Sequence, residues 1–336
     1  MKFTKKTYLD VSVVVAMLNS ETTIIKTLES LRGQAYIIRE IIVVDNGSED
    51  KSIGLVNTYA KANKKMNIQV IQREQNMGVG GSYNFGTSRT MSSYVIFMHS
   101  DGVLPSKNEV QKLVAPFLKD KLVVASYSSI LLPYDIWKKY PFWEKCLLAR
   151  SVGEVRPGLN GKFDCVKKSK FLEIGGFDDV RYGHDIGIGG EDGDLLKRFQ
   201  KIGKVVESKA KVIHLHDLRN NYSFSDWIIN RKLLARSYGR FIRLHGLDIK
   251  AGGWQFIIKP LMVLLSFICL FAPWLFFFYI LFSLYYMRNM YLSREAVLNW
   301  RIYILPFITL GLVYYETYWM IESFVSLSFS DYNNKI

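Results

Sequence analysis

Cysteine is scarce in this sequence. Only Cys146, Cys165 and Cys269 occur among 336 residues. No two of them have the spacing of a zinc site or a redox pair, and three isolated thiols cannot build the disulfide framework of a small secreted protein. The scarcity therefore excludes those classes and fits a reducing compartment.

Acidic residues are also in short supply, with 30 against 44 lysines and arginines and a net charge of +14. From residue 251 onward the chain has five basic and four acidic residues, so almost all of the excess belongs to residues 1–250. A basic domain favours a polyanionic partner, such as nucleic acid, an anionic membrane surface or a phosphorylated ligand. Because no recognition helix or aromatic-basic platform accompanies the charge, we expect no nucleic-acid partner.

A secretory signal peptide is not expected. Lysines precede the first apolar run, residues 11–18, but that run is short and β-branched and leads into "NSE" rather than a cleavage site. We interpret it as a buried strand. Further strands are predicted at 37–44, 67–72 and 94–99, with helix-patterned segments between them. Apolar strands that alternate with helices predict a mostly parallel α/β sheet covered on both faces.

Polar residues follow three of these strands. They are Asn19 and Glu21 after the first, Asp45 at the end of the second, and Ser100 and Asp101 after the fourth. Ligands of such sheets bind beyond the carboxyl ends of the strands. The pattern therefore indicates a site for an anion, a metal and a sugar rather than for an apolar ligand.

Four motifs, in this order, resemble the family-2 glycosyltransferases of the GT-A fold. They are "LNSE", "VVDNGSEDKS", "NMGVGGSYNFG" and "EIGGFDDV…GGEDGDLLKRFQKIG", and the resemblance extends from about Val11 to His216. The third is neither a Walker loop nor a dinucleotide fingerprint. The resemblance implies a GT-A domain over residues 1–250, with a nucleotide half at about 8–104 and an acceptor half at about 105–250.

The resemblance also implies a nucleotide-sugar donor and the residues that bind it. These are Asn19, Glu21, Asp45, Asn76, Gly78, Asn84 and Ser100. For Asp45 a turn is the alternative, since "DNGS" is favourable turn chemistry. One departure is Tyr83, which stands where relatives often have a basic residue, so the diphosphate needs another cation, for example Arg73 or Arg89.

The segment "MHSDG" occupies the place of the family's Asp-x-Asp motif. The resemblance assigns a divalent cation, Mn²⁺ or Mg²⁺, to Asp101, and imidazole ligands suit Mn²⁺ better. His99 replaces the first acid, and metal binding, ribose contact and a plain strand end remain open for it. Downstream, "KVIHLHD" offers His214 and His216, of which we favour His214 as a further ligand.

The acceptor side carries "GGFDD" and "GGED". By the resemblance, Gly175, Gly176, Phe177 and Asp178 belong to the acceptor region, Asp192 is the general base and Glu191 supports it. The same acids begin a helix, where Asp194 is expected to cap. The helix dipole would lower the pKa of Asp192 and weaken it as a base. Upstream, the aromatic and basic segment 134–162 is interpreted as an acceptor-binding or membrane-contacting region.

Residues 251–336 are expected to form a membrane-associated helical region. Positions 260–287 carry no charge, and as one helix they would be about 42 Å long, more than the ~30 Å hydrocarbon core. The run is either one kinked span or two arms of a hairpin that bends at Pro273. A second run, Ile302–Ile321, is weaker because it contains Glu316. Three arginines between the runs place that loop, and the basic domain, on the cytosolic face of the cell membrane.

We therefore expect a metal-dependent, inverting glycosyltransferase. It would move a sugar from a nucleotide diphosphate, by default UDP, to a hydroxyl of a lipid-linked or glycolipid acceptor, with a polyprenyl-linked glycan preferred. A polyprenyl-phosphate sugar synthase and an inactive membrane scaffold are the alternatives. The Gln-x-x-Arg-Trp motif of processive synthases is missing from "SFSDWIINRK".

Overall fold

The structure is a computed structural model of the chain. It describes most of the 336 residues, in these ranges: 8–74, 76–156, 158–182, 190–216, 218, 221–248 and 254–326. The chain divides into two compact units, which are described separately. The first comprises residues 1–132, 153–184 and 191–219, and the second comprises residues 133–152, 185–190 and 220–336.

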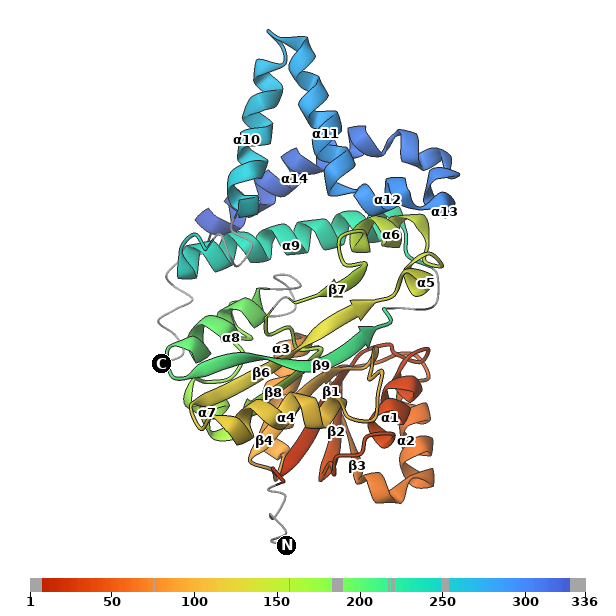
Figure 1. The fold of residues 1–336 in the computed structure, drawn as a ribbon, viewed down its shortest axis with the longest axis vertical. Helices are drawn as coiled ribbons and strands as arrows, with labels where there is room; N and C mark the ends of the chain where they lie inside the picture. Colours follow the sequence, from red (N-terminus) through yellow and green to blue (C-terminus); the bar gives the residue numbers. More distant parts are fainter. Residues whose placement is uncertain are drawn as a thin grey trace, which may run out of the picture. The chain divides into compact units, whose positions relative to one another are not determined.

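The first unit begins with four parallel strands. They are β1 (Val11–Met17), β2 (Glu40–Asp45), β3 (Ile68–Gln72) and β4 (Tyr94–His99), and they lie side by side in the order β3–β2–β1–β4 (Figure 1). β1 and β2 are buried along their whole length, as their continuous β-branched sequences require. The four strands predicted from the sequence are therefore confirmed.

The sheet continues past β4 with mixed directions. β8 (Phe163–Lys167) is antiparallel to both β4 and β6 (Val123–Leu132), whereas β6 and β9 (Lys204–His214) are parallel. Two short strands, β5 (Gly102–Val103) and β7 (Gly153–Val155), pair antiparallel with β9 and β6. The sheet is thus parallel in its nucleotide half and mixed in the half expected to bind the acceptor.

Helices cover both faces of this sheet. On one face α1 (Ile24–Arg32), α2 (Ser52–Ala62) and α4 (Glu109–Lys119) share a core with Val13 and Val15 of β1. On the other face α3 (Gly78–Arg89), α7 (Lys168–Glu173) and α8 (Glu191–Gln200) share a core with Val14. The alternation of neighbouring valines between two cores follows from the two-residue period of a strand. A 3-10 turn, η1 (Lys64–Met66), follows α2.

Close packing accounts for some of the glycines in α3. A methyl group on Gly86 would lie 2.3 Å from Cγ1 of Val14, so only glycine lets the helix approach β1 this closely. The glycine-rich segment "NMGVGGSYNFG" is therefore largely a helix that packs on the sheet, with its amino end toward the carboxyl ends of β1 and β2.

The second unit is helical. Its elements within the described residues are α5 (Tyr134–Trp137), α6 (Phe142–Leu148), α9 (Phe224–His245), α10 (Trp254–Ile268), η3 (Pro273–Leu275), α11 (Phe276–Tyr286), α12 (Arg288–Leu292), α13 (Arg294–Val297), η4 (Trp300–Tyr303) and α14 (Leu305–Val325). A capping box formed by Ser223 and Asp226 starts α9. This unit begins before residue 251, because α9 and the segment 133–152 group with the C-terminal helices.

A buried charge cluster joins three helices of the second unit. Lys259 of α10 lies 2.6 Å from Oε2 of Glu316 in α14, and Arg231 of α9 bonds to its other carboxylate oxygen. Tyr286 of α11 also accepts a hydrogen bond from Arg231. The acid that interrupts the second apolar run is therefore neutralised inside the helical unit. Breaking such a pair leaves an uncompensated buried charge, which is strongly destabilising.

The uncharged run at 260–287 folds as two arms. α10 ends at Ile268, a turn follows, and α11 begins at Phe276, so the hairpin alternative describes this run (Figure 1). None of the helices in the described ranges combines the length and the hydropathy that crossing a membrane requires.

Candidate active site

The carboxyl ends of β1, β2 and β4 meet at one edge of the sheet, as expected. Met17 pairs with Asp45, and Ala16 pairs with His99, so the loops that follow these strands start side by side. The hydroxyl oxygens of Ser20 and Ser100 are 2.7 Å apart and join two of these loops. The polar residues that the sequence places after the strands are therefore neighbours in space.

Asp45 organises the turn after β2. Its side chain is fully buried and accepts hydrogen bonds from the N–H groups of Gly47 and Ser48 and from the Ser48 hydroxyl, at 2.5–3.2 Å. These are the contacts of the turn alternative. A carboxylate has more than one lone pair on each oxygen, so the predicted nucleoside contact is compatible with them and stays a prediction.

Asn19 and Glu21 tie the first loop to the second. Asn19 Oδ1 accepts from the N–H of Glu49 at 2.9 Å, and Glu21 Oε2 accepts from the N–H of Lys51 at 3.2 Å. The Glu21 N–H in turn donates to Asp50. These bonds fix the two loops relative to each other at the edge of the sheet.

The two predicted asparagines of the third motif have different positions. Asn76 Oδ1 accepts from the N–H of Gly78 at 2.9 Å, at the start of α3 near the sheet edge. Asn84, further along α3, uses its side-chain amide to hold the backbone of Phe177, with two hydrogen bonds of 2.8 Å. Asn84 therefore links the nucleotide half to the acceptor-side turn.

The acceptor-side turn is built from glycine. Gly175 and Gly176 have φ values of +81° and +70°, and a methyl group on Gly176 would lie 2.4 Å from Asn84 Oδ1. Phe177 is buried in an aromatic cluster, whereas Asp178 pairs with Arg181. The turn is thus rigid, and its predicted acceptor contacts remain predictions.

Three side chains at the end of β4 and β9 form a possible metal site. His99, Asp101 and His214 each offer one ligand atom, and these atoms all lie within 4.8 Å of one another. Asp101 Oδ2 is 3.0 Å from His214 Nε2, and its Oδ1 is 3.8 Å from His99 Nδ1. His216 adjoins the cluster, with its ring centroid 3.9 Å from that of His214.

The protonation of this cluster suits metal binding. Burial, together with the charge of Lys162, lowers the pKa of His99 to about 3, so its imidazole is neutral and can ligate. Burial likewise lowers the pKa of His216. For Asp101, burial alone would raise the pKa, but the neighbouring histidines outweigh it and lower the pKa below its usual value.

The donor set fits a divalent cation. Asp101 Oδ1 is buried and has no hydrogen-bond partner among the described residues, which is costly unless a cation completes it. Two imidazole nitrogens and a carboxylate are ligands that Mn²⁺ accepts, consistent with the expected replacement of the first motif acid by His99.

A short loop before β8 lies between this cluster and the candidate base. A methyl group on Gly161 would lie 3.4 Å from Asp192 Oδ1, 3.6 Å from His99 Nε2 and 3.2 Å from the ring of Tyr83. Gly161 also has a φ of +65°. The candidate base and the first residue of the metal motif therefore flank the same small residue.

Two further residues of this region were not predicted as site residues, although Lys162 ends the segment 134–162 that the sequence assigns to acceptor or membrane contact. Asp164 is buried, and its Oδ2 accepts from the N–H groups of Asn160 and Gly161, at 2.6 and 2.7 Å. Lys162 is the cation whose charge acts on both His99 and Asp192. Only the Asn-Gly dipeptide at 160–161, a turn signal, marks the loop in the sequence.

Asp192 lies in the first turn of α8 beside Glu191. Its burial raises the pKa above the usual value for aspartate, while the charge of Lys162 opposes this. Desolvation therefore acts in the opposite direction to the helix dipole, which is expected to lower this pKa. Asp194 is buried and pairs with Arg198, at 2.6 Å, which also bonds to the carbonyl oxygen of Gly176. Gly189 lies outside the described residues.

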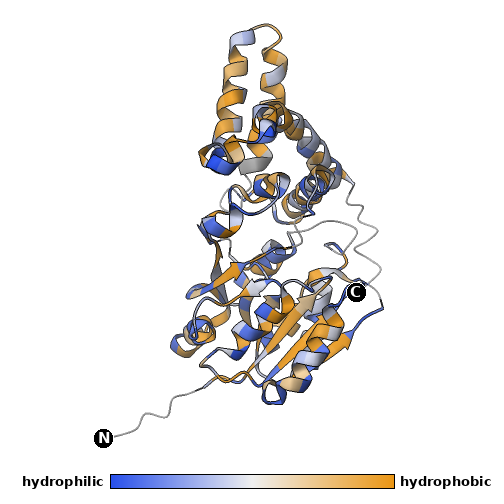
Figure 2. Ribbon diagram, turned by 90° about the vertical axis from the view of Figure 1, so that its right-hand side faces the viewer, coloured by the Kyte–Doolittle hydropathy of each residue, from blue (hydrophilic) through white to orange (hydrophobic). Residues whose placement is uncertain are grey.

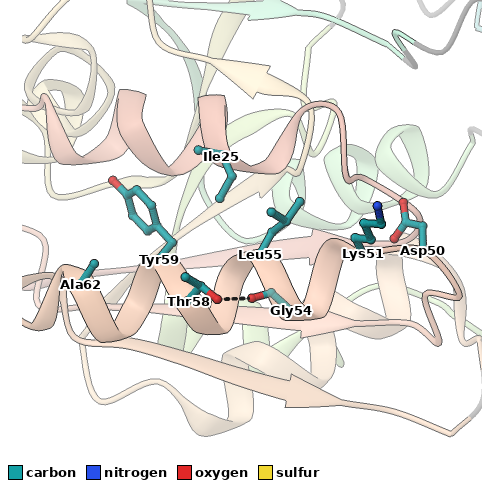
Figure 3. Close-up of a pocket in the computed structure, with 8 residues that line it drawn as sticks. All are labelled: Ile25, Asp50, Lys51, Gly54, Leu55, Thr58, Tyr59 and Ala62. Atoms are coloured by element: carbon teal, nitrogen blue, oxygen red, sulfur yellow. Dashed lines mark hydrogen bonds between the residues drawn. The ribbon is translucent and has the colours of Figure 1, made fainter.

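An open pocket between α1 and α2 does not coincide with this site (Figure 3). It is lined by Ile25, Asp50, Lys51, Gly54, Leu55, Thr58, Tyr59 and Ala62. The lining is largely apolar, and no predicted donor, metal or catalytic residue contributes to it.

Comparisons with known proteins fit this geometry. Residues 12–167 match the sequence profile of glycosyl transferase family 2. This part of the chain is therefore similar to a family-2 glycosyltransferase domain. The chain is 34% identical over 119 residues to the putative glycosyltransferase EpsH of Bacillus subtilis, a match that covers 35% of this chain and 34% of that protein. It is also 29% identical over 264 residues to the putative glycosyltransferase EpsE of the same organism, a longer match that covers 75% of this chain and 88% of that protein.

Other relatives cover less or are more distant in sequence. The chain is 30% identical over 112 residues to the dolichyl-phosphate beta-glucosyltransferase of Dictyostelium discoideum, covering 32% of this chain and 34% of that enzyme. Several curated relatives are thus matched over only about a third of their length. The mannosyltransferase PcManGT of Pyrobaculum calidifontis, solved with GDP-Man and Mn²⁺, has a TM-score of 0.59 at 14% identity, covering 96% of this chain and 89% of that one. This likeness shows the fold, an α/β architecture of the GT-A type.

Proposed function

We propose that this protein is a metal-dependent, inverting glycosyltransferase. It moves a sugar from a nucleotide diphosphate to a hydroxyl group of a membrane-associated acceptor. The observation that carries the proposal is the position of Gly161, which places the Asp192 carboxylate and the metal-motif residue His99 around one point. Transfer needs both a base and a diphosphate-binding group near the reacting carbon. The sequence motifs predict Asp192 as the base and place His99 in the metal-binding motif.

Asp192 acts as the base. As the acceptor hydroxyl attacks the anomeric carbon of the donor, Asp192 takes its proton, and the bond to the diphosphate breaks. The raised pKa makes this carboxylate a stronger base than an exposed aspartate. Direct displacement inverts the configuration at that carbon.

Asp101, His214 and His99 would hold a divalent cation, which as a Lewis acid would offset the charge of the departing diphosphate. Mn²⁺ is preferred because two of the three ligands are imidazoles. Two solved structures of similar fold support this assignment. PcManGT was solved with Mn²⁺ and GDP-Man. GalNAc-T7 was solved with UDP and Mn²⁺; it has a TM-score of 0.50 at 17% identity, covering 71% of this chain and 51% of that one. UDP is the default donor nucleotide. Lys162 supplies a nearby positive charge in place of the basic residue that Tyr83 replaces.

The acceptor is a glycan carried by a polyprenyl or other lipid, and the enzyme works at the cytosolic face of the cell membrane. The uncharged run at 260–287 and the basic balance of residues 1–250 support membrane association. Attachment to a membrane raises the effective concentration of lipid-linked substrates.

A second candidate is transfer to a polyprenyl phosphate. The match to a dolichyl-phosphate beta-glucosyltransferase favours it. A phosphate acceptor is already ionised and needs no base, so the role of Asp192 separates the two candidates.

The test uses the purified full chain with a panel of nucleotide sugars and Mn²⁺. Thermal shift identifies the donor, because a ligand at 100 times its Kd stabilises a protein by about 2.7 kcal/mol. Transfer of labelled sugar to a lipid extract then compares wild type with Asp192→Asn and with the control Asp120→Asn, which alters an exposed carboxylate.

For a hydroxyl acceptor, Asp192→Asn keeps donor binding and lowers turnover by at least about 10²-fold. Unchanged turnover with a phosphate-linked product would establish the second candidate instead. Absence of both donor binding and transfer would leave a membrane scaffold as the remaining interpretation.

A further inference from the structure

The apolar hairpin, residues 260–287, exposes its tip. Leu270 is 74% exposed, Phe271 89% and Trp274 72%. α10 and α11 form the two arms and meet at this tip (Figure 1), and hydropathy colouring shows both arms predominantly hydrophobic (Figure 2). Such large apolar side chains, exposed together on one element, require a partner that covers them.

The exposed apolar surface also extends along both arms. The contributing residues on the arms are Leu261, Leu264, Phe267, Ile268, Phe277, Phe278, Ile280, Leu281 and Leu284. The inner faces pack on each other and on α14, through Met262, Tyr279 and Val313. The hairpin is therefore packed on its inner face and leaves its apolar outer face exposed. No charged residue occurs anywhere between positions 260 and 287.

The backbone N–H groups of the turn have hydrogen-bond partners within the hairpin. The N–H groups of Cys269, Leu270, Phe271 and Ala272 each donate to a carbonyl oxygen of α10, at 2.9–3.2 Å. Pro273, the next residue, has no N–H group. Hydrocarbon supplies no hydrogen-bond partners, so a chain reversal inside it must satisfy its own amides.

The length of the arms limits how deep the hairpin can reach. α10 has 15 residues and α11 has 11. At ~1.5 Å per residue they are about 22 and 16 Å long, less than the ~30 Å hydrocarbon core of a bilayer. Each arm is thus long enough to enter one leaflet and too short to cross both.

Aromatic and basic residues at the end of the hairpin and just after it form what we call the collar. Tyr285, Trp300 and Tyr303 are 64–74% exposed, and the guanidinium groups of Arg288 and Arg301 lie over the rings of Tyr285 and Trp300. Tyrosine and tryptophan favour the interfacial region of a membrane, and arginine favours anionic headgroups.

We propose that the apolar hairpin inserts into one leaflet of an anionic bilayer without crossing it, and that the collar lies at the headgroups. This proposal specifies how the membrane association in the proposed function is achieved, and its biological role rests on that proposed function. Lipid binding can nevertheless be measured without any transferase activity, so each proposal can fail without the other.

The experiment floats the purified full-length chain with vesicles of phosphatidylcholine and phosphatidylglycerol. Wild type is expected to float with the vesicles. The double variant Phe271→Glu, Trp274→Glu should lose at least ~10-fold in partitioning, because charges at this depth are costly. The matched control Ile37→Glu replaces an equally exposed apolar residue of the first unit and should float like wild type. Far-UV circular dichroism and thermal melting confirm that both variants fold.

Depth is measured with a nitroxide on Phe271→Cys in a Cys269→Ser chain, where Cys146 and Cys165 are buried. Insertion into one leaflet predicts relaxation by oxygen and protection from a water-soluble nickel complex, whether that complex is outside or inside the vesicles. Relaxation by nickel from the lumen would mean that the hairpin crosses, and would overturn the proposal. Two other results would also overturn it. One is that the double variant floats as well as wild type. The other is that wild type without lipid is a dimer and the double variant is a monomer, because the hairpin would then be covered by a second copy of the chain.

Discussion

The phenol of Tyr83 donates a hydrogen bond to the carbonyl oxygen of Gly161, over 2.6 Å, in the interior of the first unit. Tyr83 belongs to the glycine-rich helix α3, and Gly161 belongs to the loop between the metal cluster and Asp192. The tyrosine is stacked on Phe97 and is fully buried, so its hydroxyl has a fixed position. The residue that departs from the family pattern therefore holds the loop on which the site is built.

Tyr83→Phe should destabilise the protein and impair transfer. The change leaves the Gly161 carbonyl oxygen without this donor, at a cost of about 1–3 kcal/mol for a buried polar group. Urea unfolding and turnover at saturating donor measure the two effects. Tyr94→Phe is the control, because Tyr94 packs against Phe117 through its ring, which phenylalanine keeps, and the variant should stay within about 0.5 kcal/mol of wild type. Equal effects of both variants would contradict this role.

Gly161→Ala should reduce turnover more than its effect on stability explains. A methyl group there would crowd the ring of Tyr83, Asp192 and His99. The matched control is Gly153→Ala, since Gly153 also has a positive φ, +97°, but has open space around it. Both substitutions should cost about 1–2 kcal/mol from left-handed backbone. Only Gly161→Ala should lower kcat, and similar kcat values for the two variants would show that the crowding has no catalytic consequence.

The sheet edge could be predicted because its signals are local. Apolar strands end at Met17, Asp45 and His99, and parallel pairing brings such ends together whatever the loops contain. The same reasoning predicts Asp101 and His214 as one cluster only with the help of the family pattern, since β5 pairs Gly102 with His214 across more than a hundred residues.

The loop around Gly161 could not be predicted, because its importance comes from tertiary contacts. Nothing in "LNGK" indicates that Tyr83 and Asp164 hold it from different elements. The fold of the apolar hairpin, residues 260–287, could not be predicted for a different reason. One kinked helix and two arms have the same apolar composition, and Pro273 is compatible with both. The turn hydrogen bonds that distinguish them are backbone contacts, which side-chain pattern does not encode.

Asp101→Asn should weaken metal binding. The buried Asp101 Oδ1 is available as a ligand, and an amide supplies no negative charge to hold the cation. Titration of metal-free protein with MnCl₂, followed by thermal shift, should give an affinity lower by at least ~10-fold. Chelation of wild type with EDTA should abolish transfer, and Mn²⁺ should restore it. Asp135→Asn, at an exposed position on α5, is the control. Unchanged Mn²⁺ affinity in Asp101→Asn would assign the cation to other residues.

Asp164 should make the protein less stable as the pH rises toward 8. Burial raises its pKa to about 7 in the folded chain, against an ordinary value of 3.8. The folded state therefore binds a proton that the unfolded state releases above pH 4. The stabilisation is complete below pH 4 and is lost as the pH rises through 7. The shift of about three units corresponds to about 4 kcal/mol.

Asp164→Asn removes this titration but keeps an oxygen that can accept from the N–H of Gly161. Relative to wild type, the variant should gain roughly 2–3 kcal/mol of stability as the pH rises from 5 to 8, because about a third of the full effect is already present at pH 5. Urea unfolding in EDTA at both pH values measures the gain without interference from metal. Asp120→Asn should leave the slope unchanged, since pairing with Lys204 lowers the pKa of Asp120 to values outside this window. Parallel pH profiles for wild type and Asp164→Asn would mean that Asp164 is already ionised when the chain folds, and the loop at Gly161 would then be held by a charged carboxylate.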